Sequence, residues 1–119
     1  MAVKEVTVGT KNIQVKPEAN VHLTITIGNA QIGGSIVKDE TGHIIAKGEK
    51  IDIALGNGTE LNKKTYTIIT NVLDVNKSTN GIVVTHYFHN GEPSTFTHTG
   101  KVDDDGDIYS LTTTYKFKL

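Results

Sequence analysis

Cysteine, tryptophan and arginine are all absent from this 119-residue chain. Without cysteine there is no disulfide, thiolate zinc site, iron–sulfur cluster or cysteine nucleophile. Without arginine the chain lacks the planar side chain that grips phosphate or carboxylate groups with two hydrogen bonds. Its 12 lysines are nearly balanced by 13 acidic residues, and the formal net charge is -1. This near-neutral balance argues against nucleic acid as a partner.

Long hydrophobic runs are also missing. No stretch approaches the roughly 18 apolar residues of a membrane span, so we expect no transmembrane segment. The first residues, MAVKEVT, contain no apolar core of a signal peptide. We therefore expect either an intracellular protein or an exported one whose leader has been removed. The compartment stays open, because a lack of cysteine fits both.

Threonine is the most frequent residue, with 17 copies. Its branched side chain suits a pleated, half-buried surface. Apolar and polar residues alternate with a period of two in Val21–Ile27, Ile51–Leu55 and Tyr109–Leu119, which is typical of strands. Weaker strand patterns cover Val3–Val8, Asn12–Val15, Gln31–Lys38, His43–Ala46, Thr65–Asp74, Gly81–His89 and Ser94–Val102. No window shows a sustained helical period, so the sequence predicts an all-β protein.

Turn signals separate these segments. Pairs that readily supply a positive φ stand at Asn57-Gly58, Asn80-Gly81, Asn90-Gly91 and Asp105-Gly106. Gly33-Gly34, inside a predicted strand, indicates a bulge or a close approach of two backbones. There is no repeat, linker or shift of composition. We predict one domain, residues 1–119, folded as an antiparallel β-sandwich of about eight to ten strands; the alternative is a small lipocalin-like β-barrel.

The C-terminal half allows a prediction of register. If strands 64–74, 81–89, 94–102 and 107–118 form a meander, a three-residue loop at 91–93 sets Phe88 opposite Phe96 and His86 opposite His98. A two-residue turn at 104–105 then pairs the last two strands. The inner side of strand 81–89 is Ile82, Val84, His86 and Phe88, and its Tyr87 points outward. The outward threonines at 95, 97 and 99 lie across from those at 112 and 114, as a hydroxyl-lined ribbon.

The densest charge cluster is the acidic turn at residues 103–107. Asp103, Asp105 and Asp107 alternate as oxygen ligands of calcium often do. The EF-hand pattern fails, since Ile108 and Thr114 stand where glycine and glutamate are required. In a meander the loop with Asp74 and Asn76 lies at the same end and adds oxygen donors. These five residues form our candidate cation site, with Ca²⁺ as its ion; the alternative is a solvated acidic turn.

Two further candidates come from histidine and tyrosine. The predicted register brings His86 and His98 side by side, where they either ligate a metal or form a hydrogen-bonded, partly buried pair. Such a pair resists protonation, so stability should fall below about pH 6. The outward Tyr87 offers an aromatic ring for a sugar. These three residues form our second candidate ligand site.

Enzyme signatures are missing. None of the four serines stands in a G-x-S-x-G elbow, and no phosphate-binding loop occurs. The segment Leu61–Ile68 followed by Val72–Asn76 resembles the rhythm of immunoglobulin-like and fibronectin-like modules, but the cysteine and tryptophan marks of true immunoglobulin domains are absent.

We predict a non-catalytic binding module for a protein or carbohydrate ligand, contacted through end loops or a threonine-rich face. The alternatives are a barrel around a small apolar ligand, a sugar-binding domain that depends on a divalent cation, and a metal-assisted enzyme.

Overall fold

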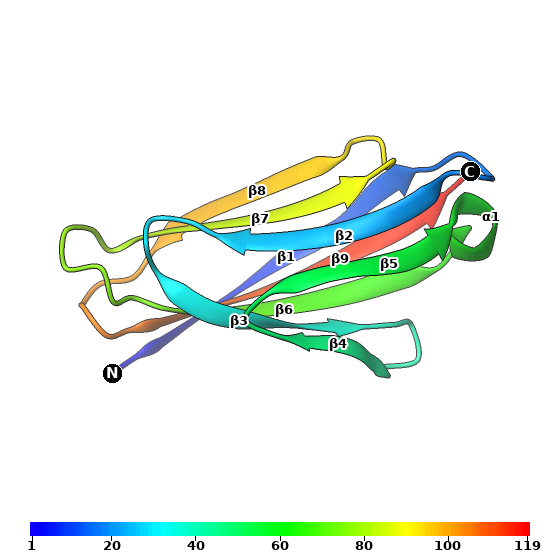
Figure 1. The fold of residues 1–119 in the computed structure, drawn as a ribbon. Helices are drawn as coiled ribbons and strands as arrows, with labels where there is room; N and C mark the ends of the chain where they lie inside the picture. The colour runs from blue at the N-terminus through cyan, green and yellow to red at the C-terminus, as the bar shows by residue number, and fades with distance from the viewer.

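Nine strands form two sheets in the computed structural model, which describes all residues from 1 to 119. They are β1 (Val3–Gln14), β2 (Asn20–Ile27), β3 (Ile32–Lys38), β4 (Ile44–Gly48), β5 (Ile51–Asn57), β6 (Thr65–Leu73), β7 (Gly81–His89), β8 (Thr95–Lys101) and β9 (Ile108–Lys118). A single helical turn, α1 (Gly58–Leu61), follows β5. The strands run along the length of a body that measures 45 × 24 × 22 Å, with the termini at opposite ends (Figure 1). The prediction of an all-β protein with about eight to ten strands is confirmed.

The two sheets pack as a sandwich. One has five strands in the order β1-β9-β6-β3-β4, and the other has four in the order β5-β2-β7-β8. Every neighbouring pair is antiparallel except β1 and β9, which run parallel, so the larger sheet is mixed. The predicted β-sandwich is confirmed. The alternative of a lipocalin-like barrel is wrong, because the sheets do not close and a cluster of 19 buried side chains fills the space between them.

Alternation along each strand decides which side chains enter this core. The predicted inner side of β7 is buried throughout, from Ile82 to Phe88. Aromatic rings occupy the centre: the ring centroid of Phe88 lies 4.6 Å from that of Tyr115 and 5.7 Å from that of Phe117. Edge-to-face and tilted ring contacts of this kind add to the stabilisation that burial provides.

The predicted meander is wrong. β6 and β7 belong to different sheets, and so do β8 and β9. β9 instead pairs with β6 and β1, while β8 pairs only with β7. The threonines of β8 therefore do not face Thr112 and Thr114, and the predicted ribbon between these strands does not exist. The physical reason is that a polar loop with glycine suits a hairpin and a link between two sheets equally well.

The hairpin of β7 and β8 is present, but its register differs from the prediction. His86 lies opposite Phe96, and Val84 lies opposite His98, a displacement of two residues. The loop is longer than expected because Glu92 leaves the hairpin and exchanges two 2.9 Å backbone hydrogen bonds with Gln14 of β1. An even displacement keeps every side chain on its predicted face.

Two glycine signals had different outcomes. A Cβ atom on Gly33 would lie 2.0 Å from the carbonyl oxygen of Asn71 on β6, so the predicted close approach of backbones is confirmed. The predicted tight turn at Asn57-Gly58 is wrong. Asn57 instead caps α1, because its side chain accepts a 2.9 Å hydrogen bond from the backbone N–H of Glu60, whose carboxylate accepts one from the N–H of Asn57.

Candidate functional site

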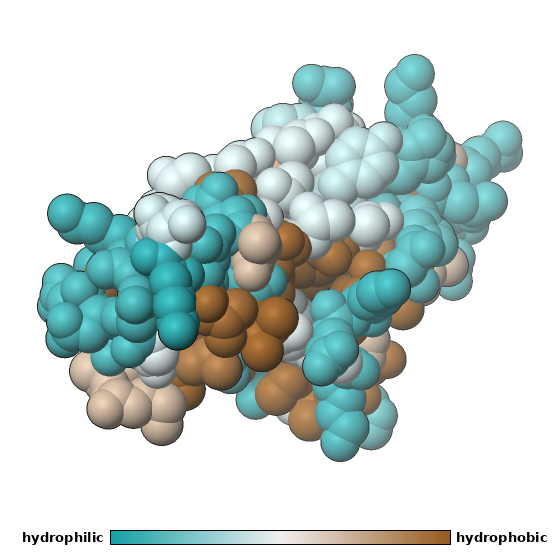
Figure 2. Space-filling view, turned by 60° about the vertical axis from the view of Figure 1, so that its left-hand side comes forward, coloured by the Kyte–Doolittle hydropathy of each residue, from teal (hydrophilic) through white to brown (hydrophobic).

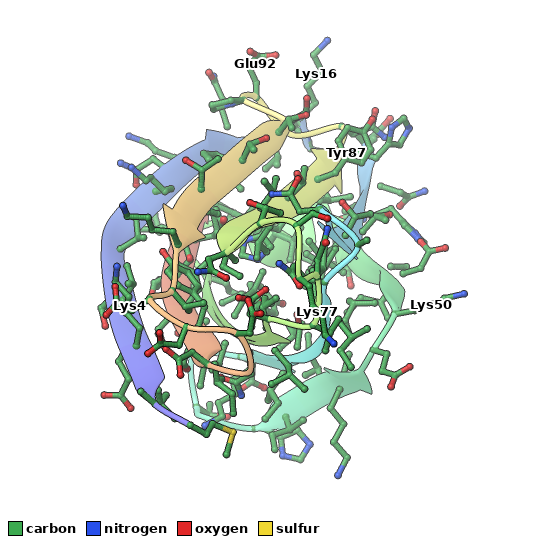
Figure 3. The ribbon with its side chains drawn as sticks, turned by 90° about the vertical axis from the view of Figure 1, so that its left-hand side faces the viewer. Lys4, Lys16, Lys50, Lys77, Tyr87 and Glu92 are labelled. Carbon is green, nitrogen blue, oxygen red and sulfur yellow. The ribbon has the colours of Figure 1, made fainter.

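The two acidic loops predicted to share an end do lie side by side. The backbone N–H of Asp74 donates to the carbonyl of Asp107 (3.0 Å), and the N–H of Gly106 donates to the carbonyl of Asp74 (2.9 Å). The Asn80 side-chain amide donates to the carbonyl of Asp103. Figure 3 looks at this end, where the loop that carries Lys77 lies beside the turn before β9. Their proximity is confirmed, although the meander that predicted it is not.

The acidic side chains at this end do not converge. Asp107 accepts hydrogen bonds from the backbone N–H groups of Ala2 (2.9 Å) and Asp104 (3.1 Å). These bonds, above all the one from Ala2, hold the pKa of Asp107 below its usual value. Asp103 and Asp105 are exposed. Asp107 thus anchors its own turn and the N-terminus.

The other two candidate ligands also hold loops. Asp74 is 2% exposed; its Oδ1 accepts from the Gln31 amide at 2.7 Å, and its Oδ2 has no partner. Asn76 accepts from the N–H of Ser78 and donates to the carbonyl of Asn29. No group of three or more histidine, aspartate or glutamate side chains is placed to hold a metal ion. The cation site stays a prediction: Asp74, Asn76 and Asp107 act as separate loop anchors, and Asp103 and Asp105 are exposed.

Gln31 is a residue that the sequence pattern did not single out. It is 6% exposed, and its Nε2 donates to Asp74 Oδ1 and lies 3.2 and 3.3 Å from the carbonyl oxygens of Thr79 and Gly81. Its Oε1 accepts from the N–H groups of residues 75 and 76 at 2.8 and 2.9 Å. One side chain therefore ties the start of β3 to the whole loop between β6 and β7. A glutamine ahead of a strand carries no sequence signal for this role.

The histidine pair lies on the inner face, as predicted. The ring centroids of His86 and His98 are 5.2 Å apart, and the hydroxyl of Tyr115 lies 2.6 Å from His86 Nδ1 and 3.1 Å from His98 Nε2. A hydroxyl can donate one hydrogen bond and accept another, so a single Tyr115 satisfies both rings. On its far side His86 Nε2 approaches the hydroxyl of Thr70, which bonds to Ser35 at 2.8 Å. A series of polar contacts therefore runs between the two sheets, from Ser35 and Thr70 through His86 and Tyr115 to His98.

Burial controls the protonation of this chain. The pKa of His86 is lowered from 6.5 to about 3, mainly because the ring is removed from solvent and to a smaller extent because His98 lies beside it. The pKa of His98 is also lowered, mainly by burial and to a smaller extent by the positive charge of Lys11. Burial raises the pKa of Tyr115. Both rings are therefore neutral near pH 7, and no carboxylate accompanies them as a further metal ligand; the neighbouring Thr113 hydroxyl is buried without a partner.

Threonine gathers on the outer face of the four-stranded sheet. Thr26, Thr85 and Thr97 form one row across β2, β7 and β8, and Tyr87 stands in the next row between Thr24 and Thr95. Tyr87 is 38% exposed and points away from the core (Figure 3), with its hydroxyl 3.0 Å from His89 Nδ1. We call this surface the hydroxyl face; it comprises Thr24, Thr26, Thr85, Tyr87, Thr95, Thr97 and Thr99. The predicted outward threonines of β8 are confirmed, with partners other than those expected.

The outer face of the five-stranded sheet carries an unexpected apolar row. Val3, Ile108, Leu73 and Ile32 are direct cross-strand neighbours on β1, β9, β6 and β3, and all four point away from the core. Val3 and Ile32 are each 56% exposed. We call this row the ridge. In Figure 2 brown apolar side chains gather near the loop end of the molecule, below a pale and weakly polar area.

A hollow runs beside the ridge. The next cross-strand row consists of small or polar residues, Glu5, Ser110, Asn71 and Gly34, and we call it the groove. The next cross-strand row, beyond the groove, again has large apolar side chains, Ile69 and Ile36. A hollow of about 640 Å³ is lined by Ile32, Ile36 and Leu73 among others, and the backbone of Gly48 lies against Gly34, where a Cβ atom would be 3.0 Å from the Gly48 carbonyl oxygen.

Lysines gather towards one end of the five strands. Beyond the groove the outward positions of the five strands include four lysines and no acidic residue. We call these residues the lysine end; they are Lys38, Lys47, Lys116 and Lys118. The exposed Asp103, Asp104 and Asp105 lie past the ridge, at the opposite end, just before β9 begins. This face therefore presents an apolar ridge, a groove that includes the exposed Glu5, and a lysine end beside which the loop after β3 places Asp39 and Glu40.

A signal for the ridge was present in the sequence. Adjacent apolar residues such as Ile36-Val37, Ile68-Ile69 and Val72-Leu73 put apolar side chains on both faces of a strand, which indicates that both faces are covered.

Comparisons with known proteins found no matching family model, curated protein or solved structure. No helix of this chain is long and apolar enough to cross a membrane.

Proposed function

We propose that this chain is a non-catalytic interaction module that binds a protein partner through the outer face of its five-stranded sheet. The observation that carries the proposal is the ridge, a continuous apolar row across four strands in which Val3 and Ile32 are exposed and Leu73 and Ile108 are half-buried. Soluble proteins rarely leave contiguous apolar rows in water, and those that do usually bind another protein there. Isolated exposed apolar residues would carry no such meaning.

The surroundings of the ridge support a protein partner. The ridge is flanked by a groove and by a polar rim that includes Lys47 and Glu49. An apolar centre with a charged rim is the usual composition of a protein–protein interface. The non-catalytic part of the proposal rests on the sequence, which carries no nucleophile elbow or phosphate loop.

Affinity capture from the source cells tests this proposal. We would use three baits: the native chain, Ile32→Glu in the ridge, and Thr97→Glu on the hydroxyl face as the matched control. Both replaced side chains point into solvent, so each variant should fold. We expect a protein that binds the native chain and the control but loses at least tenfold in recovery with Ile32→Glu. Binding that survives this change would contradict the proposal, as would a native bait that retains nothing.

Carbohydrate binding through the hydroxyl face is a second candidate function. The observation that favours it is the exposed ring of Tyr87 set among threonine hydroxyls. A ring packs against the C–H groups of a sugar, while hydroxyls exchange hydrogen bonds with its polar groups. A glycan array probed with and without Ca²⁺ tests it, and Tyr87→Ala should abolish any signal. A signal that survives Tyr87→Ala would rule out this face.

A further inference from the structure

We infer that the free edge of β8 binds an extended segment of another protein, which adds to the four-stranded sheet as a further strand. This edge lies on the other sheet from the ridge, so the inference goes beyond the proposed function. Three features of the structure carry it: the backbone groups that β8 turns outwards, the regular pairing that distinguishes β8 from the other edge strands, and the reach of β1 past β8.

The first feature is the backbone of β8. This strand is the last of its sheet and pairs with β7 alone. The carbonyl of Ser94 accepts a 2.6 Å hydrogen bond from the N–H of Phe88 on β7, so alternation directs the even-numbered residues of β8 towards β7 as well. The N–H and C=O groups of Thr95, Thr97 and Thr99 therefore point away from the sheet. Such a row of donors and acceptors is what an extended chain pairs with.

The second feature is the regularity of β8. The sandwich has three other edge strands, and each contains an extra residue that interrupts its ladder: β1 at residues 9–10, β4 at Ile45 and β5 at Leu55. Bulges of this kind bend an edge strand and protect it from pairing with another chain. β8 has no such interruption over Thr95–Lys101 and contains no proline. Of the four edges, β8 is thus the one that is suited to accept a strand.

The third feature is the reach of β1. The side chains of β8 pack on β9: the Phe96 ring lies 5.0 Å from that of Tyr115, and His98 Nε2 lies 3.1 Å from the Tyr115 hydroxyl. β1 pairs with the outer edge of β9, so the five-stranded sheet extends past β8 on this side (blue in Figure 3). A strand added beside β8 would lie over the inner side of β1.

Hydrogen bonds between β1 and the hairpin of β7 and β8 lie near the two ends of β8. Gln14 exchanges backbone hydrogen bonds with Glu92, ahead of β8, and Lys4 Nζ donates to the carbonyl of Lys101, the last residue of β8 (3.1 Å). Between these two points the odd-numbered threonines of β8 are exposed. The segment would pair with this central part of the strand.

The inner side of β1 defines the chemistry of the segment. Val6 and Val8 pair with core residues of β9 and are only half-buried. Apolar side chains on one face of the segment would complete their burial. Lys11 lies on the same side of β1, and its positive charge reaches His98, so an acidic residue at one end of that face complements it. The opposite face adjoins the threonines of β8, which favours threonine or another β-branched residue there.

The reach of β1 also decides the form of the occupant. Neighbouring strands of one sheet lie about 4.8 Å apart. If two copies of this chain paired through β8 across a two-fold axis, β1 of each copy would enter the space that the larger sheet of the other copy occupies. A single extended segment carries no second sheet and meets no such obstacle. We therefore assign the edge to an extended segment of a different protein and not to a second copy.

Titration with a synthetic peptide, followed by NMR of the isotope-labelled chain, tests this site. The probe is a peptide of about nine residues in which valine and threonine alternate and the last residue is aspartate. We expect the amide signals of Thr95, Thr97 and Thr99 to shift and their hydrogen exchange to slow, because these N–H groups gain acceptors. The control peptide has proline in place of the central threonine, whose N–H would face β8, and it should not bind.

Two substitutions at one position separate backbone pairing from side-chain binding. Thr97→Pro removes an N–H that points away from the sheet, a position at which an edge strand accepts proline. It should weaken peptide binding about tenfold or more. Thr97→Val keeps the N–H and the β-branched shape, and it should bind the peptide as the native chain does. Circular dichroism checks that both variants fold, and the exchange measurement on the native chain depends on neither.

Three results would overturn the inference. The first is a native chain whose three threonine amides neither shift nor slow at about 1 mM peptide. The second is equal peptide affinity for Thr97→Pro and Thr97→Val. The third is a dimer of this chain that forms through β8, because the reach of β1 excludes it.

The same variants separate this inference from the proposed function. Ile32→Glu, on the other sheet, should leave peptide binding to β8 unchanged. In capture from cells, a protein lost with Ile32→Glu and kept with Thr97→Pro belongs to the ridge. A protein with the reverse pattern belongs to β8. Either proposal can therefore fail while the other stands.

Discussion

Replacing Gln31 with leucine should cost this protein a large part of its stability. Gln31 is almost fully buried, and its amide joins the start of β3 to the loop between β6 and β7. Leucine is similar in size but can neither donate nor accept a hydrogen bond. The change therefore removes the polar contacts while it keeps most of the packing.

The loss can be worked out from the groups left behind. The N–H groups of Val75 and Asn76 each lose an acceptor at 2.8 and 2.9 Å, and each loss costs about 1 kcal/mol. The carboxyl group of Asp74 loses the donor that bonds its Oδ1, while its Oδ2 has no partner to begin with. An uncompensated buried charge costs about 3–5 kcal/mol, less whatever water gains access as the loop opens. These contributions add up to roughly 5–7 kcal/mol before the gain from water access, so we expect a net loss of about 3–5 kcal/mol, a large share of the roughly 5–15 kcal/mol typical of a domain.

Urea denaturation measures the free energy of unfolding for this test. Gln14→Leu is the matched control, because Gln14 is exposed and its side chain makes no hydrogen bond within the chain; we expect it to change stability by less than about 0.5 kcal/mol. Adding Asp74→Asn to Gln31→Leu should recover part of the loss, since a neutral amide costs less to bury than a charge. A loss below about 1 kcal/mol for Gln31→Leu would refute the view that this amide clamps the loop.

Two further predictions concern a buried base and a glycine. The pKa of His86 is about 3 in the native state and 6.5 when unfolded, so the unfolded state binds more protons and stability falls as the pH decreases below 6.5. The contribution of His86 should reach roughly 2 kcal/mol at about pH 5; a denaturation series should show the full loss in the native chain and in His43→Gln, and only the smaller contribution of His98 in His86→Gln. A flat profile would contradict the buried state of this ring. Gly33→Ala should destabilise the fold by more than about 3 kcal/mol, because its methyl group would collide with the carbonyl oxygen of Asn71, whereas Gly9→Ala has open space and should be nearly neutral in the same assay.

Much of the local structure was predictable because alternation is a local property. The inner side of β7, the outward threonines of β8 and the position of Tyr87 all follow from a period of two along one strand. The close approach at Gly33 follows from two glycines inside a strand. The neighbouring histidines were also predictable, since a register error of two residues moves neither ring to the other face.

The pairing of strands was not predictable in the same way. The loop between β8 and β9 has the chemistry of a hairpin turn, yet it joins the two sheets. The exchange of backbone hydrogen bonds between Glu92 and Gln14 links residues that are far apart in the chain, and no local pattern encodes it. The candidate cation site had the same weakness. Its residues share one end of the fold, but Asp74, Asn76 and Asp107 each form their own hydrogen bonds, and Asp103 and Asp105 are exposed.

The sequence by itself determined that this protein is a β-sheet protein, which side chains of each strand share a face, and that arginine and cysteine chemistry have no part in it. Only the tertiary structure decided which face is buried in the strands that are apolar on both sides. Val3, Ile32, Leu73 and Ile108 are as apolar as many core residues, and a strand rich in apolar residues on both sides does not reveal which side is covered. That choice depends on which strands become neighbours and on where the second sheet packs. The ridge and its groove, and with them the proposed interface, arise from contacts between residues distant in the chain.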